Sequence, residues 1–266
     1  MANFENESAP DPKHDFYRKA LDMLTRSKIP YLVGGAYALG FYTGILRDTK
    51  DLDVFVKTSD CLGALHIFEG AGFQTELTYS HWLAKACWND HLVDIIFSSG
   101  NALSEVDELW FENAAQGELF GFPVRFIPPE EMIWSKGLVM ERERYDGADV
   151  NHILLACAKN LDWKRLLKRF GPYWRVLLSH LVLFGFAYPG KRGLVPEWVM
   201  RDLLARMETE LENAPGEHVC LGTLLSRTQY KIDTEQWGFR DHRLQPFGKM
   251  TKKQIREWDA GAPAPG

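Results

Sequence analysis

The chain of 266 residues lacks a long apolar run. Its longest one, around residues 176–187, is interrupted by Ser179 and His180 and is shorter than the roughly 18 to 20 apolar residues that a membrane-spanning helix needs. Residues 1–15 also lack the basic start and apolar core of a secretory signal. We therefore expect a cytoplasmic protein with no membrane partner.

Cysteine is also scarce. No two of the four are spaced as a zinc knuckle or a redox pair requires, which argues against a metal-thiolate site and against a disulfide framework. Each cysteine is expected to be reduced and to act as a small buried apolar residue. The four are Cys61, Cys87, Cys157 and Cys220.

Charge is unevenly distributed along the chain. The net charge is −5, but acidic residues outnumber basic ones in residues 1–158 and the reverse holds in residues 159–266. Composition is otherwise typical of globular proteins, with 45% hydrophobic and 25% charged residues. The split suggests two segments with different tasks.

The order of expected elements indicates an α+β protein, with a mixed sheet flanked by helices followed by a mainly helical part. Apolar periodicity, turn residues and β-branched content assign these elements. Expected strands are 31–33, 51–56, 74–78, 82–87, 92–97 and 124–127. Expected helices are 12–28, 35–46, 60–69, 106–115, 130–142, 148–160, 163–170, 172–186 and 196–212. We expect an α/β domain over 1–128, a helical domain over 129–259 and a disordered tail over 260–266.

Three aspartates stand out because acids are depleted in strands. Asp51 and Asp53 are two residues apart on an expected strand, so both carboxylates project from one face. Asp94 interrupts the apolar run 92–97. If the two strands are neighbours, three carboxylates converge, and Mg²⁺ is the natural ion between them. Three carboxylates are enough for a two-metal site. A capping or ion-pairing role for Asp94 alone is nearly as plausible.

A Gly34-Gly35 pair follows a short strand and opens a helix. The first backbone N–H groups of a helix have no partner within it and lie at its positive end, where they attract phosphate. Glycine allows a triphosphate to approach the backbone closely. A glycine pair by itself is more often only a turn.

The order Gly-Gly, Asp-x-Asp and a distal strand aspartate resembles the nucleotidyltransferase superfamily typified by DNA polymerase beta. The Arg47-x-Thr49-x-Asp51-x-Asp53 block, with a later lysine and arginine, resembles most its small bacterial members, the abortive-infection and type IV toxin-like nucleotidyltransferases. The resemblance covers about residues 28–160. It implies that Gly34 and Gly35 hold the triphosphate of an NTP. It also implies that the three aspartates bind two Mg²⁺ ions, with Mn²⁺ as the alternative, and that Asp94 is the general base.

Weaker candidates surround these residues. Arg47 and Lys50 precede the acidic strand and are candidates for phosphate contacts, although solvated loop charges are equally plausible. Lys136 resembles the family's nucleotide-contacting lysine. Arg144 is the preferred functional residue in a charged cluster that otherwise suggests structural ion pairing, in which Asp146 would be an N-cap. His81, Trp82 and Lys85 either line a pocket or are an ordinary packed aromatic with two surface polar residues.

The second half is rich in basic residues. Lys164, Arg165, Lys168 and Arg169 recur on one helix face, and the excess continues over residues 159–206. A solvated amphipathic face explains one helix, whereas the sustained excess makes tRNA or another RNA plausible as the acceptor. A small-molecule acceptor remains open. So does a different class of function, a catalytically silent nucleotide- or RNA-binding module of the same fold.

Overall fold

The computed structural model describes residues 12–212 and 218–261. The chain divides into two compact units, Met1–Pro128 and Pro129–Gly266. The last helix reaches Ala260, so the expected tail at 260–266 falls mostly outside the described residues. Within the described ranges, no helix is both long and apolar enough to cross a membrane.

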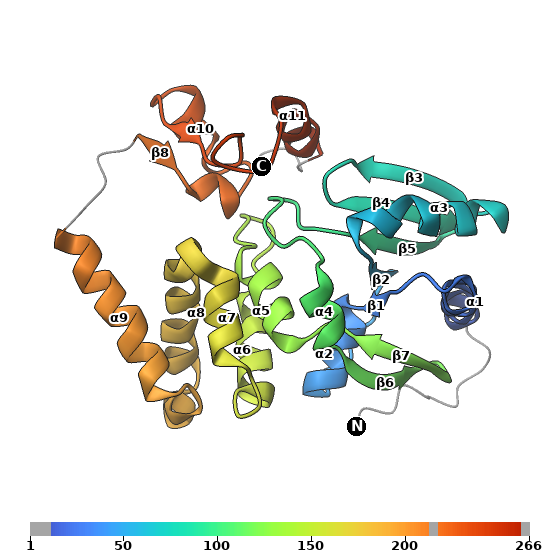
Figure 1. The fold of residues 1–266 in the computed structure, drawn as a ribbon, viewed down its shortest axis with the longest axis horizontal. Helices are drawn as coiled ribbons and strands as arrows, with labels where there is room; N and C mark the ends of the chain where they lie inside the picture. Colours follow the sequence, from blue (N-terminus) through green and yellow to red (C-terminus); the bar gives the residue numbers. More distant parts are fainter. Residues whose placement is uncertain (1–11, 213–217, 262–266) are drawn as a thin grey trace. The chain divides into compact units, whose positions relative to one another are not determined.

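The first unit holds a mixed sheet to which, in the described part of the unit, seven strands contribute in the order β3-β4-β5-β2-β1-β7-β6 (Figure 1). The strands are β1 (Leu32–Val33), β2 (Asp51–Phe55), β3 (Gln74–Tyr79), β4 (Leu83–Trp88), β5 (His91–Ile96), β6 (Ala115–Leu119) and β7 (Phe122–Phe126). The helices are α1 (Pro12–Ser27), α2 (Gly35–Thr43), α3 (Cys61–Gly70) and α4 (Glu108–Glu112).

Strand β2 occupies the centre of this sheet. It pairs antiparallel with β1 and parallel with β5, and β5 continues antiparallel into β4. Helices α1 and α3 pack together and against β5, and α3 lies across β3, β4 and β5 (Figure 1). The two acidic strands, β2 and β5, are therefore direct neighbours in the sheet.

Apolar and acidic side chains alternate along the central strands β2 and β5, so the sheet has an apolar face and a polar face there. Leu52, Val54, Val93 and Ile95 are fully buried, whereas the aspartates between them are only half-buried. Successive side chains of a strand point to opposite faces. The apolar residues therefore form the core of the unit, and the aspartates stand together on the other face.

Two expectations for the first unit were wrong. The helix expected over 106–115 is shorter (α4), and the chain then forms strand β6 over Ala115–Leu119, which the sequence analysis missed. Its residues, Ala-Gln-Gly-Glu-Leu, have little β propensity, so pairing with β7 rather than local preference makes the strand. Helix α2 also ends at Thr43, not near 46, because Gly44 adopts the left-handed conformation that closes a helix.

The second unit is mainly helical. Helices α5, α6, α7 and α8 lie side by side, and α9 packs along α8 (Figure 1). Their bounds are α5 (Pro129–Gly137), α6 (Gly147–Cys157), α7 (Trp163–Phe170), α8 (Trp174–Ala187) and α9 (Glu197–Glu212). A mixed sheet and a separate helical unit make the described chain an α+β protein, as expected.

A buried ionic cluster joins α5 to α7 at the centre of this unit. Arg165 contacts Glu130 at 2.5 Å and Glu131 at 2.9 Å, and Arg169 contacts Glu131 at 3.0 Å. The Glu131 side chain is completely buried, and burial raises the pKa of its carboxyl group against the opposing effect of both arginines. Burying an acid without such partners would be costly, so these two arginines serve the interior of the unit.

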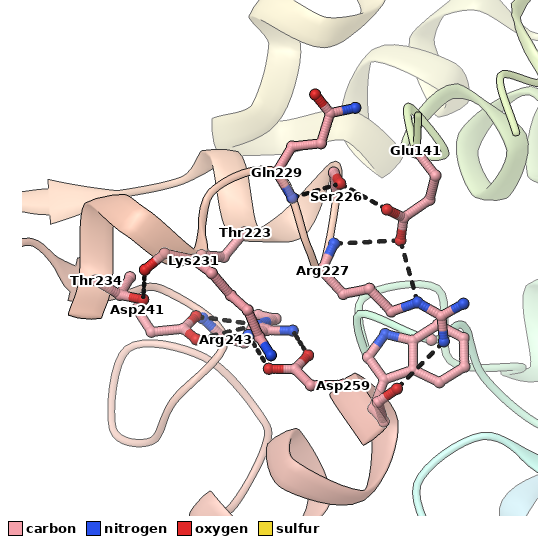
Figure 2. Close-up of polar contacts among 12 residues, drawn as sticks. Glu141, Thr223, Ser226, Arg227, Gln229, Lys231, Thr234, Asp241, Arg243 and Asp259 are labelled. Carbon is pink, nitrogen blue, oxygen red and sulfur yellow. Dashed lines mark hydrogen bonds and ion pairs between the residues drawn. The ribbon is translucent and has the colours of Figure 1, made fainter. Parts of the chain in front are cut away.

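Residues after 217, whose sequence shows weak periodicity, form small elements held by polar contacts (Figure 2). Arg243, only 3% exposed, binds Asp241 at 2.8 Å and Asp259 of the last helix at 2.7 Å. Arg227 donates to the Trp258 carbonyl oxygen and lies over its ring. The elements are β8 (Val219–Cys220), α10 (Lys231–Glu235), β9 (Arg240–Asp241) and α11 (Lys252–Ala260).

All four cysteines are free thiols. Cys61, Cys157 and Cys220 are buried, as expected, whereas Cys87 on β4 is half-buried. Burial raises the pKa of the Cys61 and Cys157 thiols to about 11. Thiols with so high a pKa remain protonated and unreactive.

Candidate functional site

The three sequence-predicted aspartates lie on one face of two adjacent strands. Asp53 of β2 stands directly opposite Asp94 of β5 in the parallel ladder, and Asp51 precedes Asp53 by two residues. All three are half-buried. Thr49 donates its hydroxyl hydrogen to the Asp51 carboxylate at 2.6 Å. Sheet pairing thus brings together carboxylates that are 43 residues apart in sequence.

The Gly34-Gly35 turn lies against this acidic face. The backbone N–H of Gly34 donates to the Asp53 carbonyl oxygen at 3.0 Å, and Gly35 begins helix α2. Gly35 has a φ of +54°, and a Cβ placed on it would lie 1.7 Å from the Asp53 Oδ2 atom. Only glycine fits there. The Gly34-Gly35 turn and the acidic face are therefore one structural feature.

The carboxyl group of Asp94 has a perturbed pKa. Burial raises the pKa of its carboxyl group, Lys85 lowers it, and the negative charge of Asp51 raises it further, so the result is an upward shift. The Lys85 Nζ atom lies 2.8 Å from Asp94 Oδ1. A carboxylate with a raised pKa accepts a proton more readily than an exposed one.

The acidic face fits a divalent cation by its chemistry. Carboxylate oxygens are the ligands that Mg²⁺ prefers, and the cradle at Gly35 keeps the Asp53 carboxylate beside the turn. In residues 12–212 and 218–261, however, no three histidine, cysteine or acidic side chains already converge closely enough to hold a metal ion. The Lys85 ammonium group, beside Asp94, supplies a positive charge instead.

Arg47 and Lys50, the candidates for phosphate contacts, lie in the loop between α2 and β2. Both side chains are exposed. Lys13 of α1 fixes this loop through an ion pair with Asp48 and a hydrogen bond to the Thr49 carbonyl oxygen. The loop therefore leads directly into the acidic strand and is anchored to α1 at Asp48 and Thr49, just before that strand.

Lys136 and Arg144 belong to the second unit. Lys136 Nζ lies 2.8 Å from Asp149 and 3.2 Å from Asp146, and Arg144 contacts Asp146 at 2.9 Å. Asp146 precedes α6 at the N-cap position but makes no side-chain capping bond, because its carboxylate binds the two cations. Burial opposes the shift, yet these cations lower the pKa of Asp146.

Five arginines of segment 159–206 are paired with acids. Arg165 and Arg169 serve the buried cluster described above. Further pairs lie on the surface: Arg175 with Glu210, Arg201 with Glu197 and Arg206 with Asp202. The sequence analysis had placed Arg165 on the same surface as its neighbours Lys164 and Lys168, and of these only the lysines are exposed. Acids outside the segment thus cancel much of its charge.

For Lys85 the sequence leaves two roles open, lining a pocket or being an ordinary surface residue, and the structure pairs it with Asp94. The signal was present, because a two-residue turn at Asn89-Asp90 places Lys85 opposite Asp94 in the hairpin of β4 and β5. His81 and Trp82 lie in the turn just before strand β4, where His81 bonds the Gly100 carbonyl oxygen and Trp82 stacks on Tyr79.

Comparison with known proteins gives solved structures only. No protein-family profile matches the chain, and no curated protein sequence does. The chain is similar to the solution structure of the antibiotic-resistance factor ANT(2'')-Ia, with a TM-score of 0.45, 21% identity, and coverage of 63% of this chain and 95% of that one.

Two further structures are similar at lower levels. The lincomycin-bound lincosamide antibiotic adenylyltransferase LnuA has a TM-score of 0.39 and 16% identity over 55% of this chain and 98% of its own. The Megavirus polyadenylate synthase has the same TM-score and identity over 57% of this chain and 34% of its own. Because these identities are low, the function of the chain has to be inferred from its own acidic face.

Proposed function

We propose that the chain is a Mg²⁺-dependent nucleotidyltransferase that moves a nucleoside monophosphate from an NTP to an acceptor hydroxyl and releases pyrophosphate. The observation that carries the proposal is the acidic face, with Asp53 opposite Asp94 and Asp51 on the same face. The glycine turn at the start of α2 lies directly against it. Carboxylates for metal binding and a phosphate-binding turn are the two parts that this reaction needs.

Each part has a defined task. The Gly34-Gly35 turn would bind the triphosphate at the positive end of α2, through the N–H groups of the first turn of that helix, because the Gly34 N–H is engaged with the Asp53 carbonyl oxygen. Asp51, Asp53 and Asp94 would hold Mg²⁺ as two ions, or Mn²⁺ in its place. When bound, the metal offsets phosphate charge and lowers the pKa of the acceptor hydroxyl. The acceptor oxygen bonds to the α-phosphorus, the bond to the bridging oxygen breaks, and Asp94 takes the hydroxyl proton.

Four basic residues are proposed as nucleotide contacts. Arg47 and Lys50 are exposed in the loop that enters β2, where their charge would attract phosphate. Lys136 and Arg144 share the Asp146 carboxylate in the second unit. Because Lys136 is already paired with two acids, its contribution to nucleotide binding would require one of those contacts to open.

We favour a small molecule over RNA as the acceptor. Five arginines of segment 159–206 are engaged with acids, so the positive potential that RNA binding requires is reduced. A gel shift with bulk tRNA tests this choice. We expect no salt-sensitive complex, whereas a shift that weakens steeply with salt would indicate an RNA acceptor.

Transfer of each α-labelled NTP to small molecules and to total RNA tests the function itself. Replacing Asp51 or Asp53 by Asn should lower transfer at least about a hundredfold, because each removes a charged ligand but no volume. Asp90→Asn is the matched control, since it removes an exposed acid of the same sheet and should leave transfer unchanged. Full activity in both site variants would refute the proposal. NTP binding without product for any acceptor would favour the silent nucleotide-binding module.

A further inference from the structure

Lys85 stands in line with the acids across three neighbouring strands. It lies opposite Asp94 in the antiparallel ladder of β4 and β5, and Asp94 lies opposite Asp53 in the parallel ladder of β5 and β2. Directly opposed residues project from the same face of a sheet. The face therefore carries a row of one ammonium group followed by two carboxylates.

The contact between Lys85 and Asp94 is close and partly shielded from water. The Nζ–Oδ1 distance is 2.8 Å, and the side chains are 27% and 14% exposed, respectively. A carboxylate in such surroundings needs a nearby positive charge to stay ionised. Lys85 supplies that positive charge.

A divalent cation on this face would compete with Lys85. A metal ion bound to Asp94 would lie within a few ångströms of an ammonium group that donates to the same carboxylate. Two positive charges at that separation repel strongly where water is partly excluded. A lysine has a flexible four-carbon stem and a strongly hydrated head group, so Lys85 can leave Asp94 for solvent without a backbone change.

The lysine is not required to hold the strands together. Strands β4 and β5 are paired over six residue pairs, from Leu83 with Ile96 to Trp88 with His91. Apolar residues on the opposite face of these strands are fully buried, Ala84, Ala86, Val93 and Ile95 among them. Backbone pairing and this core fix the hairpin, which leaves the charge of Lys85 available for another task.

We propose that Lys85 is an exchangeable counter-ion of Asp94, released when a divalent cation binds the acidic face, and that it thereby sets the metal affinity of the site. The proposal rests on the proposed function in taking Asp94 as a metal ligand. It adds a positioning residue that holds the Asp94 carboxylate in place until the metal arrives. Lys85 makes metal binding weaker than the three carboxylates alone would give.

Titration of the full-length protein with Mn²⁺, followed by the electron paramagnetic resonance signal of the free ion, tests the proposal. Lys85→Met keeps the stem but removes the charge, and we expect Mn²⁺ to bind about tenfold more tightly, which corresponds to about 1.4 kcal/mol. Lys57→Met is the matched control. Lys57, of similar exposure, is paired with Glu108 in the same unit, and its loss should leave Mn²⁺ affinity unchanged.

Thermal unfolding gives a second readout. Without metal, Lys85→Met leaves the Asp94 charge without its lysine partner. The thermal unfolding midpoint of the variant should therefore fall below that of the wild type. Saturating Mn²⁺ should raise the midpoint of the variant by more than it raises that of the wild type, because tighter binding to the folded state stabilises it more. A purely structural ion pair would lower the midpoint without any gain in metal affinity.

The outcomes separate this proposal from the proposed function. One set of results overturns the role of Lys85 alone. In it, the wild type binds Mn²⁺, Asp53→Asn abolishes that binding, and Lys85→Met binds Mn²⁺ no more tightly than the wild type does. Absence of Mn²⁺ binding in the wild type and full transfer by Asp53→Asn overturn the proposed function. If Lys85→Met fails to fold, Lys85→Gln takes its place, and failure of both to fold shows a structural residue and also overturns the proposal.

Discussion

Gly35 is where the chain backbone approaches the acidic face most closely, so the Gly35→Ala variant tests the geometry of the site directly. The added methyl group would lie 1.7 Å from Asp53 Oδ2, 2.6 Å from its Cγ atom and 3.1 Å from its Cβ atom. Rotation of the carboxylate relieves only the first of these contacts. Either Asp53 or the start of α2 must therefore move.

Two costs add at this position. Alanine in the left-handed region at φ +54° costs roughly 1 to 2 kcal/mol, and overpacking of a filled site typically costs about 1 to 3 kcal/mol more. The functional cost should be larger, because a displacement of about 1 Å of a positioned group lowers the rate roughly a hundredfold. We expect Gly35→Ala to remain folded, with a reduced free energy of unfolding and almost no transfer.

Gly44 provides the matched control. It closes the other end of helix α2 at φ +74°, but a Cβ placed on it meets no atom within 4 Å. Gly44→Ala should therefore carry the conformational cost alone and retain transfer. Both variants are measured by urea unfolding and by transfer of α-labelled NTP. Together the two assays separate the effect of backbone strain from the effect of displacing Asp53. Wild-type transfer by Gly35→Ala would refute the reasoning, as would equal losses in the two variants.

Two further predictions concern the second unit. Arg243→Met leaves two mostly buried carboxylates without their positive partner. It should lower the free energy of unfolding, measured by urea titration, by about 3 kcal/mol. The exposed control Arg201→Met should lower it by less than about 1 kcal/mol. Burial lowers the pKa of His180 below 6.5, although its bond to the Gly137 carbonyl oxygen opposes this. The unfolded chain then binds a proton that the folded chain does not, so stability should fall as pH drops below 6.5, by up to about 1.4 kcal/mol per unit. His180→Gln should reduce this slope, leaving the part due to His242, whose pKa burial also lowers, and the exposed control His66→Gln should keep it in full; an unchanged slope in His180→Gln would contradict the assignment.

Local patterns were sufficient for the long elements. The four-residue spacing of Phe16, Ala20 and Leu24 predicts α1, and those residues are buried. Local patterns failed where pairing decides the structure, as at β6, whose residues have little β propensity and become a strand only against β7. The short elements after residue 217 are held by Arg243 and Arg227, contacts that no periodicity reveals.

The charge of segment 159–206 shows the same limit. Its sequence suggested a basic surface, yet Glu130, Glu131 and Glu210, all outside the segment, bind three of its arginines. Charge counted along a chain measures composition, whereas the potential at a surface depends on which groups face each other in space. The small-molecule acceptor is favoured for that reason.

The sequence by itself determined that Asp51 and Asp53 share a face, because the two-residue period of a strand admits no other result. It also determined a helix start at Gly34-Gly35. Only the tertiary structure decided that β5 lies beside β2 with Asp94 opposite Asp53, that Gly35 cradles the Asp53 carboxylate, and that Lys85 pairs with Asp94 within this row. Strand order and register between distant segments follow from burial of the whole apolar face and from backbone pairing, which a local sequence pattern does not contain.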